Sequence, residues 1–223
     1  MGRASDMADE DRTLDQLRIA LAPRIARAAV FDGWGDAALH AAAAAEGVDP
    51  AVARLAFPGG AMDMIAAWVA AIDASMVRAY GDGALGNMKI RERIRTLVQF
   101  RLDAVAKEQE ALRRALAIEA MPQNLPRSLR IGWHSADLMW RLAGDTATDY
   151  NHYTKRATLG ALYAATLAVF IDDESEGKAE TRAFLDRRIE GVMAFEKAKA
   201  RFLARREGFD VARFLGRLRY PAH

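Results

Sequence analysis

Histidines and aspartates in the second half of the chain form the first candidate for a reactive site: His134, Asp137, Asp145, Asp149 and His152. The first two lie one turn apart on one face of an expected helix. Such side chains could ligate a metal ion. Di-iron sites in helical bundles, however, use Glu-x-x-His pairs, because a glutamate and an imidazole one turn apart can reach one cation. The sequence contains no such pair, so no metal site is predicted.

The run GDGALG at residues 81–86 formally matches the dinucleotide-binding fingerprint. In that fingerprint the glycines follow a strand and let the backbone approach a pyrophosphate at a helix start. Here a long expected helix precedes the run, so it is predicted to be a loop. The sequence also lacks His-Glu-x-x-His, a Gly-x-Ser-x-Gly elbow and a phosphate loop. Without a visible acid, base and nucleophile, we expect no catalytic residues and no cofactor.

Composition limits the class of protein. The 223 residues are 52% apolar and 28% charged, which is typical of a folded globular chain. The absence of cysteine rules out disulfides, thiolate metal sites and a cysteine nucleophile. With 32 basic and 30 acidic residues, the net charge of +2 lacks the electrostatic footprint of a dedicated nucleic-acid binder.

Two segments bear on membrane insertion and targeting. The longest nearly uncharged stretch, residues 157–171, is shorter than the roughly 20 residues of a spanning helix. Residues 1–11 are polar and include four acids, so we expect neither a signal peptide nor a transit peptide. Residues 2–6 could precede a native start at Met7, and residues 1–12 are left out of the fold interpretation.

Apolar residues recur at helical spacing almost throughout, and β-branched runs are nearly absent, so the chain is predicted to be all-α. Thr13 is a candidate cap of the first helix, Gly47 a helix terminator and Pro50 a first helical residue. The expected helices cover residues 13–30, 36–46, 50–57, 61–80, two segments within 88–121, 127–142, 150–171, 178–206 and 209–220.

The helices at 36–46 and 50–57, joined at Gly47, form a helix-turn-helix-like unit. The second helix offers one basic residue, Arg54, and no Asn, Gln, Ser or Thr to read base edges. A helical pair that packs without reading DNA is therefore favoured. A ligand-responsive DNA-binding regulator remains the alternative.

The helix expected at 209–220 has one apolar, aromatic face beside arginines. Such a helix can lie in a lipid interface with its arginines near anionic headgroups, and a tail packed on a protein core is the alternative. The candidate membrane-binding residues are Phe209, Val211, Arg213, Phe214, Leu215, Arg217 and Leu218.

Four sequence runs carry a resemblance to a known family. They are GWHSADLMW at 132–140, DYNHYTKRATL at 149–159, FPGG at 57–60 and TRAFLDRRI at 181–189. The chain resembles the coenzyme Q biosynthesis protein nine family, in which a tryptophan often occupies the position of His152. The resemblance implies a TetR-like bundle of about ten helices. Its parts would be a helix-turn-helix-like region at 13–60, a lipid-binding and dimerisation region at 61–207 and a membrane-binding helix at 208–223.

The resemblance also implies a function and partners. The protein would be a non-catalytic accessory factor that binds polyprenylated quinone intermediates, or a phospholipid, and presents them to demethoxyubiquinone hydroxylase. It would lie in the cytoplasm on the inner membrane of a bacterium, or on the matrix side in a eukaryote. The patch that meets the hydroxylase would comprise Tyr150, His152, Tyr153, Lys155 and Arg156.

Two further features agree with this function. Small residues in 150–171 suggest a homodimer through that helix and 178–202. A polyprenyl tail needs an apolar cavity, which adaptable methionines and aromatics could line, although ordinary core packing is the alternative for each of them. The small residues are Ala157, Gly160, Ala161, Ala164 and Ala168, and the candidate lipid-binding residues are Met62, Met64, Trp68, Met76, Trp133, Met139, Trp140 and Tyr163.

Overall fold

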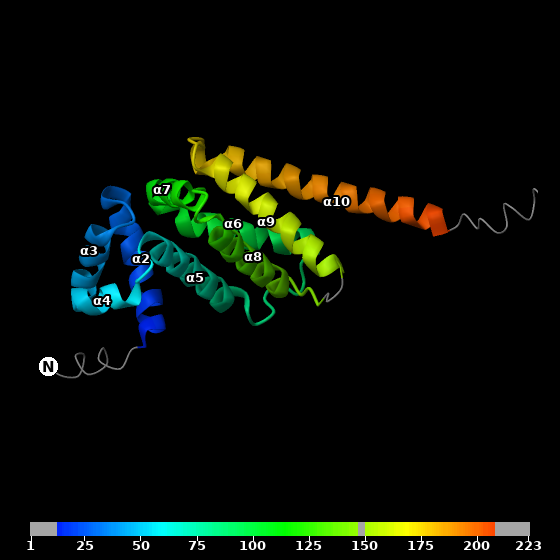
Figure 1. Ribbon diagram of the computed structural model, residues 1–223. Helices are drawn as coiled ribbons and strands as arrows, with labels where there is room; N and C mark the ends of the chain where they lie inside the picture. Colours follow the sequence, from blue (N-terminus) through cyan, green and yellow to red (C-terminus); the bar gives the residue numbers. More distant parts are fainter. Residues whose placement is uncertain (1–12, 147–149, 208–223) are drawn as a thin grey trace, which may run out of the picture.

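The computed structural model describes residues 13–146 and 150–207, and every regular element in these residues is helical (Figure 1). The all-α prediction is therefore confirmed, and the predicted boundaries of the long helices agree to within two residues. Residues 1–12 and the helix expected at 209–220 lie outside the described residues. The α-helices are α2 (Leu14–Asp32), α3 (Asp36–Glu46), α4 (Pro50–Ala56), α5 (Ala61–Tyr80), α6 (Ile90–Val105), α7 (Gln109–Glu119), α8 (Leu125–Leu142), α9 (Tyr150–Phe170) and α10 (Ala179–Glu207).

Local capping explains where the first helices begin and end. Thr13 and Gln16 form a capping box, in which Thr13 Oγ1 accepts from Gln16 N at 3.3 Å and Gln16 Oε1 accepts from Thr13 N at 2.9 Å. Gly47 ends α3 in the left-handed conformation, with φ 71°. Asp49 caps α4 by accepting from Ala51 N at 2.6 Å. These are the signals that the sequence shows at the same positions.

The helix-turn-helix-like unit, α2 to α4, is attached to the rest of the bundle by Trp34. Its indole N–H donates to the Ala111 carbonyl of α7 at 2.9 Å, and its ring lies 5.4 Å from that of Trp68 on α5. On α4, Arg54 forms an ion pair with Asp36 at 3.4 Å, and the exposed Leu55 beside it is apolar. The outer face of α4 therefore has little chemistry for reading base edges.

The FPGG run is the tight turn between α4 and α5. Phe57 is buried, Gly60 has φ 60°, and Asp63 accepts from Gly59 N at 2.5 Å while Arg127 of α8 pairs with the same carboxylate. A Cβ on Gly59 would lie 2.8 Å from the Asp63 side chain, so glycine is needed there. In the described part of the chain no single helix is long and apolar enough to span a membrane; α4 and α5, bent by 81°, meet that criterion only as a pair, by length and composition.

The GDGALG run lies in the loop between α5 and α6, as predicted, and Gly83 there has φ 76°. Arg93 of α6 holds this loop against the end of α8, since its guanidinium donates to the carbonyls of Gly86 and Ala143, each at 2.7 Å. The run is therefore a structural turn.

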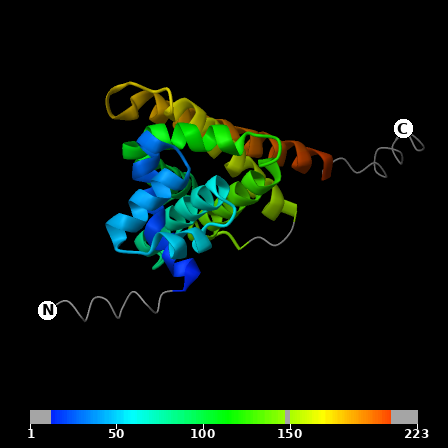
Figure 2. The same cartoon turned by 60° about the vertical axis from the view of Figure 1, so that its left-hand side comes forward.

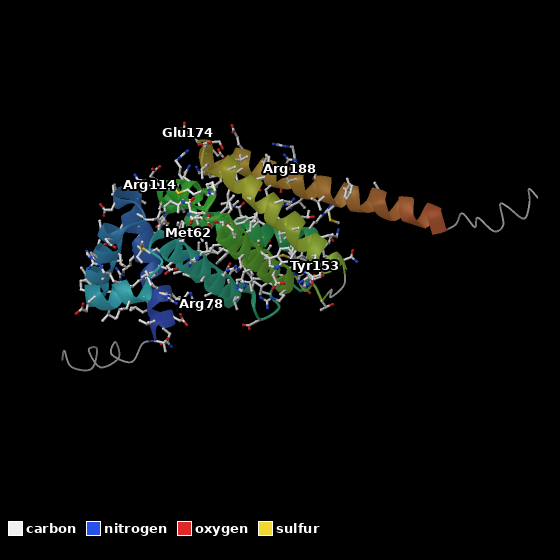
Figure 3. All side chains as sticks on the ribbon, in the orientation of Figure 1. Met62, Arg78, Arg114, Tyr153, Glu174 and Arg188 are labelled. Atoms are coloured by element: carbon white, nitrogen blue, oxygen red, sulfur yellow. The ribbon has the colours of Figure 1, made fainter. Side chains whose placement is uncertain are left out.

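Helix α5 lies in the centre of the bundle, against α2, α6 and α8 (Figures 1 and 3). Because it has neighbours on several sides, its methionines and tryptophan fill the core. Five of the side chains that were expected to line a lipid cavity are buried in this core: Met62, Met64, Trp68, Met76 and Met139.

Helices α9 and α10 are joined by a turn built on Asp173. Its carboxylate accepts from the backbone N–H groups of Ser175 and Thr181, each at 2.8 Å. The second half of α10 projects beyond the other helices (Figures 1 and 2). This divergence leaves a space between α10 and the start of α9.

Candidate ligand cavity and docking surface

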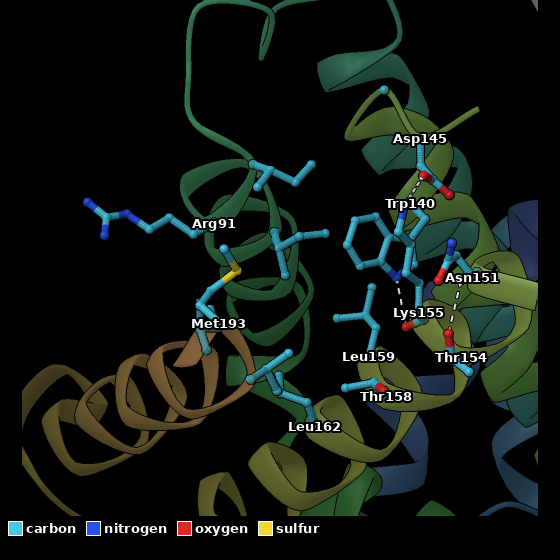
Figure 4. A pocket seen from close by; sticks show the side chains of 15 residues that line it. Arg91, Trp140, Asp145, Asn151, Thr154, Lys155, Thr158, Leu159, Leu162 and Met193 are labelled. Carbon is cyan, nitrogen blue, oxygen red and sulfur yellow. Dashed lines mark hydrogen bonds and ion pairs between the residues drawn. The ribbon is translucent and has the colours of Figure 1, made fainter. Parts of the chain in front are cut away.

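A cavity of about 360 Å³ opens between the start of α6, the end of α8, the first half of α9 and α10 (Figure 4). Its walls are mainly aliphatic, and its polar side chains lie toward the α8–α9 connection. The apolar lining is Ile90, Ile94, Trp140, Leu159, Leu162, Ile189, Val192 and Met193, and the polar lining is Arg91, Asp145, Asn151, Thr154, Lys155 and Thr158.

Trp140 forms one wall of the cavity and is fixed by Lys155. The indole N–H donates to the Lys155 carbonyl at 2.9 Å, and Lys155 Nζ lies 5.4 Å from the centre of the ring. The same ammonium pairs with Asp145 at 2.6 Å, while Arg91 is directed away from these residues (Figure 4). The polar end therefore offers hydrogen-bonding groups whose charges are largely balanced, which suits an amphiphile with an uncharged head.

Arg156 lies beneath this polar end and holds α8, α9 and their connection together. Its guanidinium is 2% exposed and pairs with Asp137 at 2.6 Å and Asp145 at 3.0 Å. Burial opposes ionisation of Asp145, but the hydrogen bonds from Lys155 and Arg156 outweigh it and hold the pKa of this carboxyl below its ordinary value. These carboxylates therefore serve ion pairs, and no group of His, Asp and Glu in the described residues could hold a metal ion.

An aromatic surface lies outside the cavity. The rings of Trp133 on α8 and Tyr153 on α9 are 6.1 Å apart, and His152 packs edge-on against Tyr153 at 5.2 Å. Tyr153 is 61% exposed, and Figure 3 shows it at the outer edge of the bundle. Exposed aromatic side chains in contact with one another are typical anchors of protein interfaces.

The residues expected to dock a partner are divided by the structure. Tyr153 is exposed and His152 half-buried, so both can contribute to a surface. Lys155 lines the cavity, and Arg156 is buried in ion pairs, which corrects their placement on the outer patch. Tyr150 begins α9, and its side chain lies outside the described residues.

The residues expected to line a lipid cavity also require correction. Trp140 lines the cavity, whereas Trp133 lies on the outer surface and Tyr163 packs inside the bundle against Arg101 at 5.0 Å. The five core residues of α5 and α8 do not line it. Sequence reasoning missed the lining residues Ile94, Leu159, Leu162, Ile189 and Val192, because buried aliphatic residues at helical spacing carry no sign that one neighbouring helix will diverge.

Comparison with known proteins gives this region a family. Residues 125–196 match the COQ9 family model. These residues belong to the COQ9 family. The COQ9 region comprises α8, α9 and the first part of α10, and it supplies every cavity-lining residue except Ile90, Arg91 and Ile94 of α6.

Two curated relatives are named ubiquinone biosynthesis protein COQ9, mitochondrial. The human protein is 31% identical over 168 residues, which cover 72% of this chain and 52% of the relative. The rat protein is 39% identical over 111 residues, which cover 50% of this chain and 36% of the relative. The chain thus spans about half, or less, of the length of these COQ9 proteins.

Among solved structures, a TetR transcriptional regulator from Nitrosomonas europaea superimposes with a TM-score of 0.63. The match covers 78% of this chain and 96% of the regulator, at 22% sequence identity. The TetR-like fold is therefore confirmed, and at this identity the likeness concerns the fold alone.

Proposed function

We propose that this chain is a non-catalytic, lipid-binding accessory protein of ubiquinone biosynthesis. It binds polyprenylated quinone intermediates and presents them to demethoxyubiquinone hydroxylase at a membrane surface. The observation that carries the proposal is the cavity of about 360 Å³, with aliphatic walls and one polar end, built mainly from the COQ9 region.

The cavity chemistry fits an isoprenoid quinone. A planar ring can lie against the Trp140 indole, with Asn151, Thr154 and Lys155 near its oxygens. The first part of the tail would then follow the aliphatic side chains of α9 and α10. The volume is within the range of about 300–1,000 Å³ that is usual for small-molecule sites, and the cargo takes the place that a cofactor would have in an enzyme.

The position of the cavity supports presentation to a partner. On one turn of α9, Tyr153 faces the outer surface while Thr154 and Lys155 line the cavity. A ring held near Lys155 would lie just beneath a docked hydroxylase. We place the protein at the surface of the inner membrane, as a homodimer whose terminal helix at 208–223 contacts lipid.

A cavity-filling variant tests the proposal. Leu162→Trp adds bulk to the cavity wall and should reduce the isoprenoid quinone recovered by mass spectrometry of organic extracts by at least about 10-fold. The protein is first incubated with a short-chain ubiquinone in mild detergent. Leu55→Trp, on the exposed face of α4, is the matched control and should retain the wild-type load. Equal loading of all three chains, or none in wild type, would contradict lipid binding by this cavity.

The TetR-like fold keeps a DNA-binding regulator as the second candidate. Such a function predicts DNA retention with a steep salt dependence. The single ion-paired arginine of α4 argues against it. A filter-binding assay with random duplex DNA at two salt concentrations distinguishes the two functions.

A further inference from the structure

An exposed apolar ridge runs along α8 and ends at the aromatic surface. It comprises Leu125, Leu129 and Trp133, called here the α8 ridge. Leu129, in its centre, is 72% exposed. Trp133, at its end, contacts Tyr153 of α9. Large apolar side chains this exposed and this close together mark interaction surfaces more often than isolated ones do.

The spacing of the ridge suits another helix. Its members are four residues apart, so their Cβ atoms lie about 5–6 Å from one another in one row. Rows of this kind pack into the groove of a facing helix. Gly132 beside Trp133 has no side chain, and a Cβ built there would meet nothing within 4 Å. This leaves open space next to the indole for a side chain of the facing helix.

Charge around the ridge specifies the facing helix further. Arg130 and His134 are exposed on α8, and Arg130 forms no ion pair within the described residues. Helix α9 contains no acidic residue, and the one acid of α8, Asp137, is occupied by Arg156 and Arg141. The surface is therefore cationic and complements carboxylates.

We propose that the α8 ridge, together with Tyr153, is the docking site for an amphipathic helix of the hydroxylase whose apolar face is bordered by carboxylates. This inference rests on the proposed function, since it assumes the same partner, and it extends the contact along α8 to residues outside the family motif at 149–159. Trp133 and Tyr153 anchor one end, and Leu125 and Leu129 continue the contact along the helix.

Two other occupants fit the surface less well. A second copy docked here about a twofold axis would bring two cationic surfaces together. A bilayer favours side chains that project from the protein, whereas the Trp133 ring is only 38% exposed and inclined at 32° to that of Tyr153. Rings arranged in this way form a wall against which a helix can pack.

The absence of cysteine allows a direct test of contact. Leu129→Cys, labelled with an environment-sensitive fluorophore, is titrated with purified demethoxyubiquinone hydroxylase. The emission should shift to the blue and saturate as the label is buried. Leu55→Cys on α4, at 66% exposure, is the matched control and should not respond. A response only at position 55, or equal responses at both positions, would contradict the proposal.

Charge variants test the energetics. Leu129→Glu should weaken hydroxylase binding at least about 10-fold, because it places a carboxylate in the centre of an apolar contact facing carboxylates. Leu55→Glu should leave binding unchanged. Arg130→Glu should weaken it several-fold at low salt and less at high salt, since exposed charges are screened. All three variants should keep the wild-type melting temperature, because each side chain is exposed.

The outcomes separate the two proposals. If the wild-type chain does not bind the hydroxylase at any salt concentration, both fail. If it binds and Tyr153→Ala weakens binding while Leu129→Glu does not, the inference about the α8 ridge alone is overturned. It is also overturned if Leu129→Glu spares hydroxylase binding but abolishes flotation with phosphatidylcholine–phosphatidylglycerol vesicles, or converts a dimer into a monomer.

Discussion

Tyr153 and Arg156 are three residues apart on α9, yet the tyrosine is 61% exposed and the arginine only 2%. Arg156 reaches inward to Asp137 and Asp145. Tyr153 lies over the outer surface against Trp133. A short motif thus contains one residue that can contact a partner and another that holds the underlying helices together.

Substitutions should separate these roles. Arg156→Ala leaves two acids without their buried partner, so the free energy of unfolding should fall by about 3 kcal/mol. Tyr153→Ala should change it by less than about 1 kcal/mol but should weaken hydroxylase binding. Urea unfolding and a binding titration of each variant check this. A large stability loss in Tyr153→Ala would show that its main role is packing.

A second buried pair lies in the centre of the bundle. Arg101 pairs with Asp73, which also accepts from Ser135 Oγ at 3.0 Å. Asp73→Ala leaves a buried guanidinium unpaired and should destabilise the fold by about 3–5 kcal/mol. The double variant Asp73→Leu with Arg101→Met removes both charges and should be more stable than the single one. Urea unfolding of the full cycle measures the coupling, and a double variant worse than Asp73→Ala would contradict this account.

The sequence predicts helix boundaries well where local chemistry sets them. The capping box at Thr13, the left-handed Gly47 and the first-turn Pro50 act within a few residues, so they can be found without knowledge of the tertiary structure. The helical period also places Arg101 among apolar neighbours, and the structure buries it there. Its partner Asp73 lies 28 residues away, and no local pattern pairs the two.

Glu119 gives stability a dependence on pH. Burial raises the pKa of this carboxyl from 4.5 to about 7. Between these values the folded state binds a proton that the unfolded state has lost, so stability falls as pH rises from about 4.5 to 7. Glu119→Gln should remove this slope and stabilise the protein at pH 8 by about 1–3 kcal/mol. Urea unfolding at pH 5 and pH 8 checks it, and a parallel pH dependence in both chains would count against Glu119.

The homodimer prediction can be tested on α9. Four of the small residues on this helix are exposed: Ala157, Ala161, Ala164 and Ala168. If two copies pack there closely, Ala161→Arg should convert dimers to monomers without unfolding the protein. Light scattering over a wide concentration range gives the mass. Leu55→Arg on α4 is the control, and a dimer that survives Ala161→Arg would place the interface elsewhere.

The lining of the cavity could not be predicted from residue type. Met64 of α5 and Met193 of α10 are both methionines on apolar helix faces, yet the first is core and the second lines the cavity. The difference arises because α5 has neighbours on several sides, whereas α10 diverges from α6 and α9 near Met193. Relative helix directions depend on the summed packing of the whole bundle, so a search for adaptable side chains selects core and cavity residues alike.

The segment at 208–223 carries the last prediction. Its sequence places Arg213 and Arg217 beside the apolar residues Phe214 and Leu218, and an arginine near an anionic surface contributes about 1 kcal/mol. Changing both arginines to glutamine should therefore weaken binding to anionic liposomes about 30-fold at low salt and less at high salt. Phe214→Asp should weaken binding at any salt concentration, because it removes apolar insertion. Flotation with anionic and neutral liposomes measures both effects. If a chain that ends at Gly208 stays folded and floats like wild type, the membrane contact lies in another part of the protein.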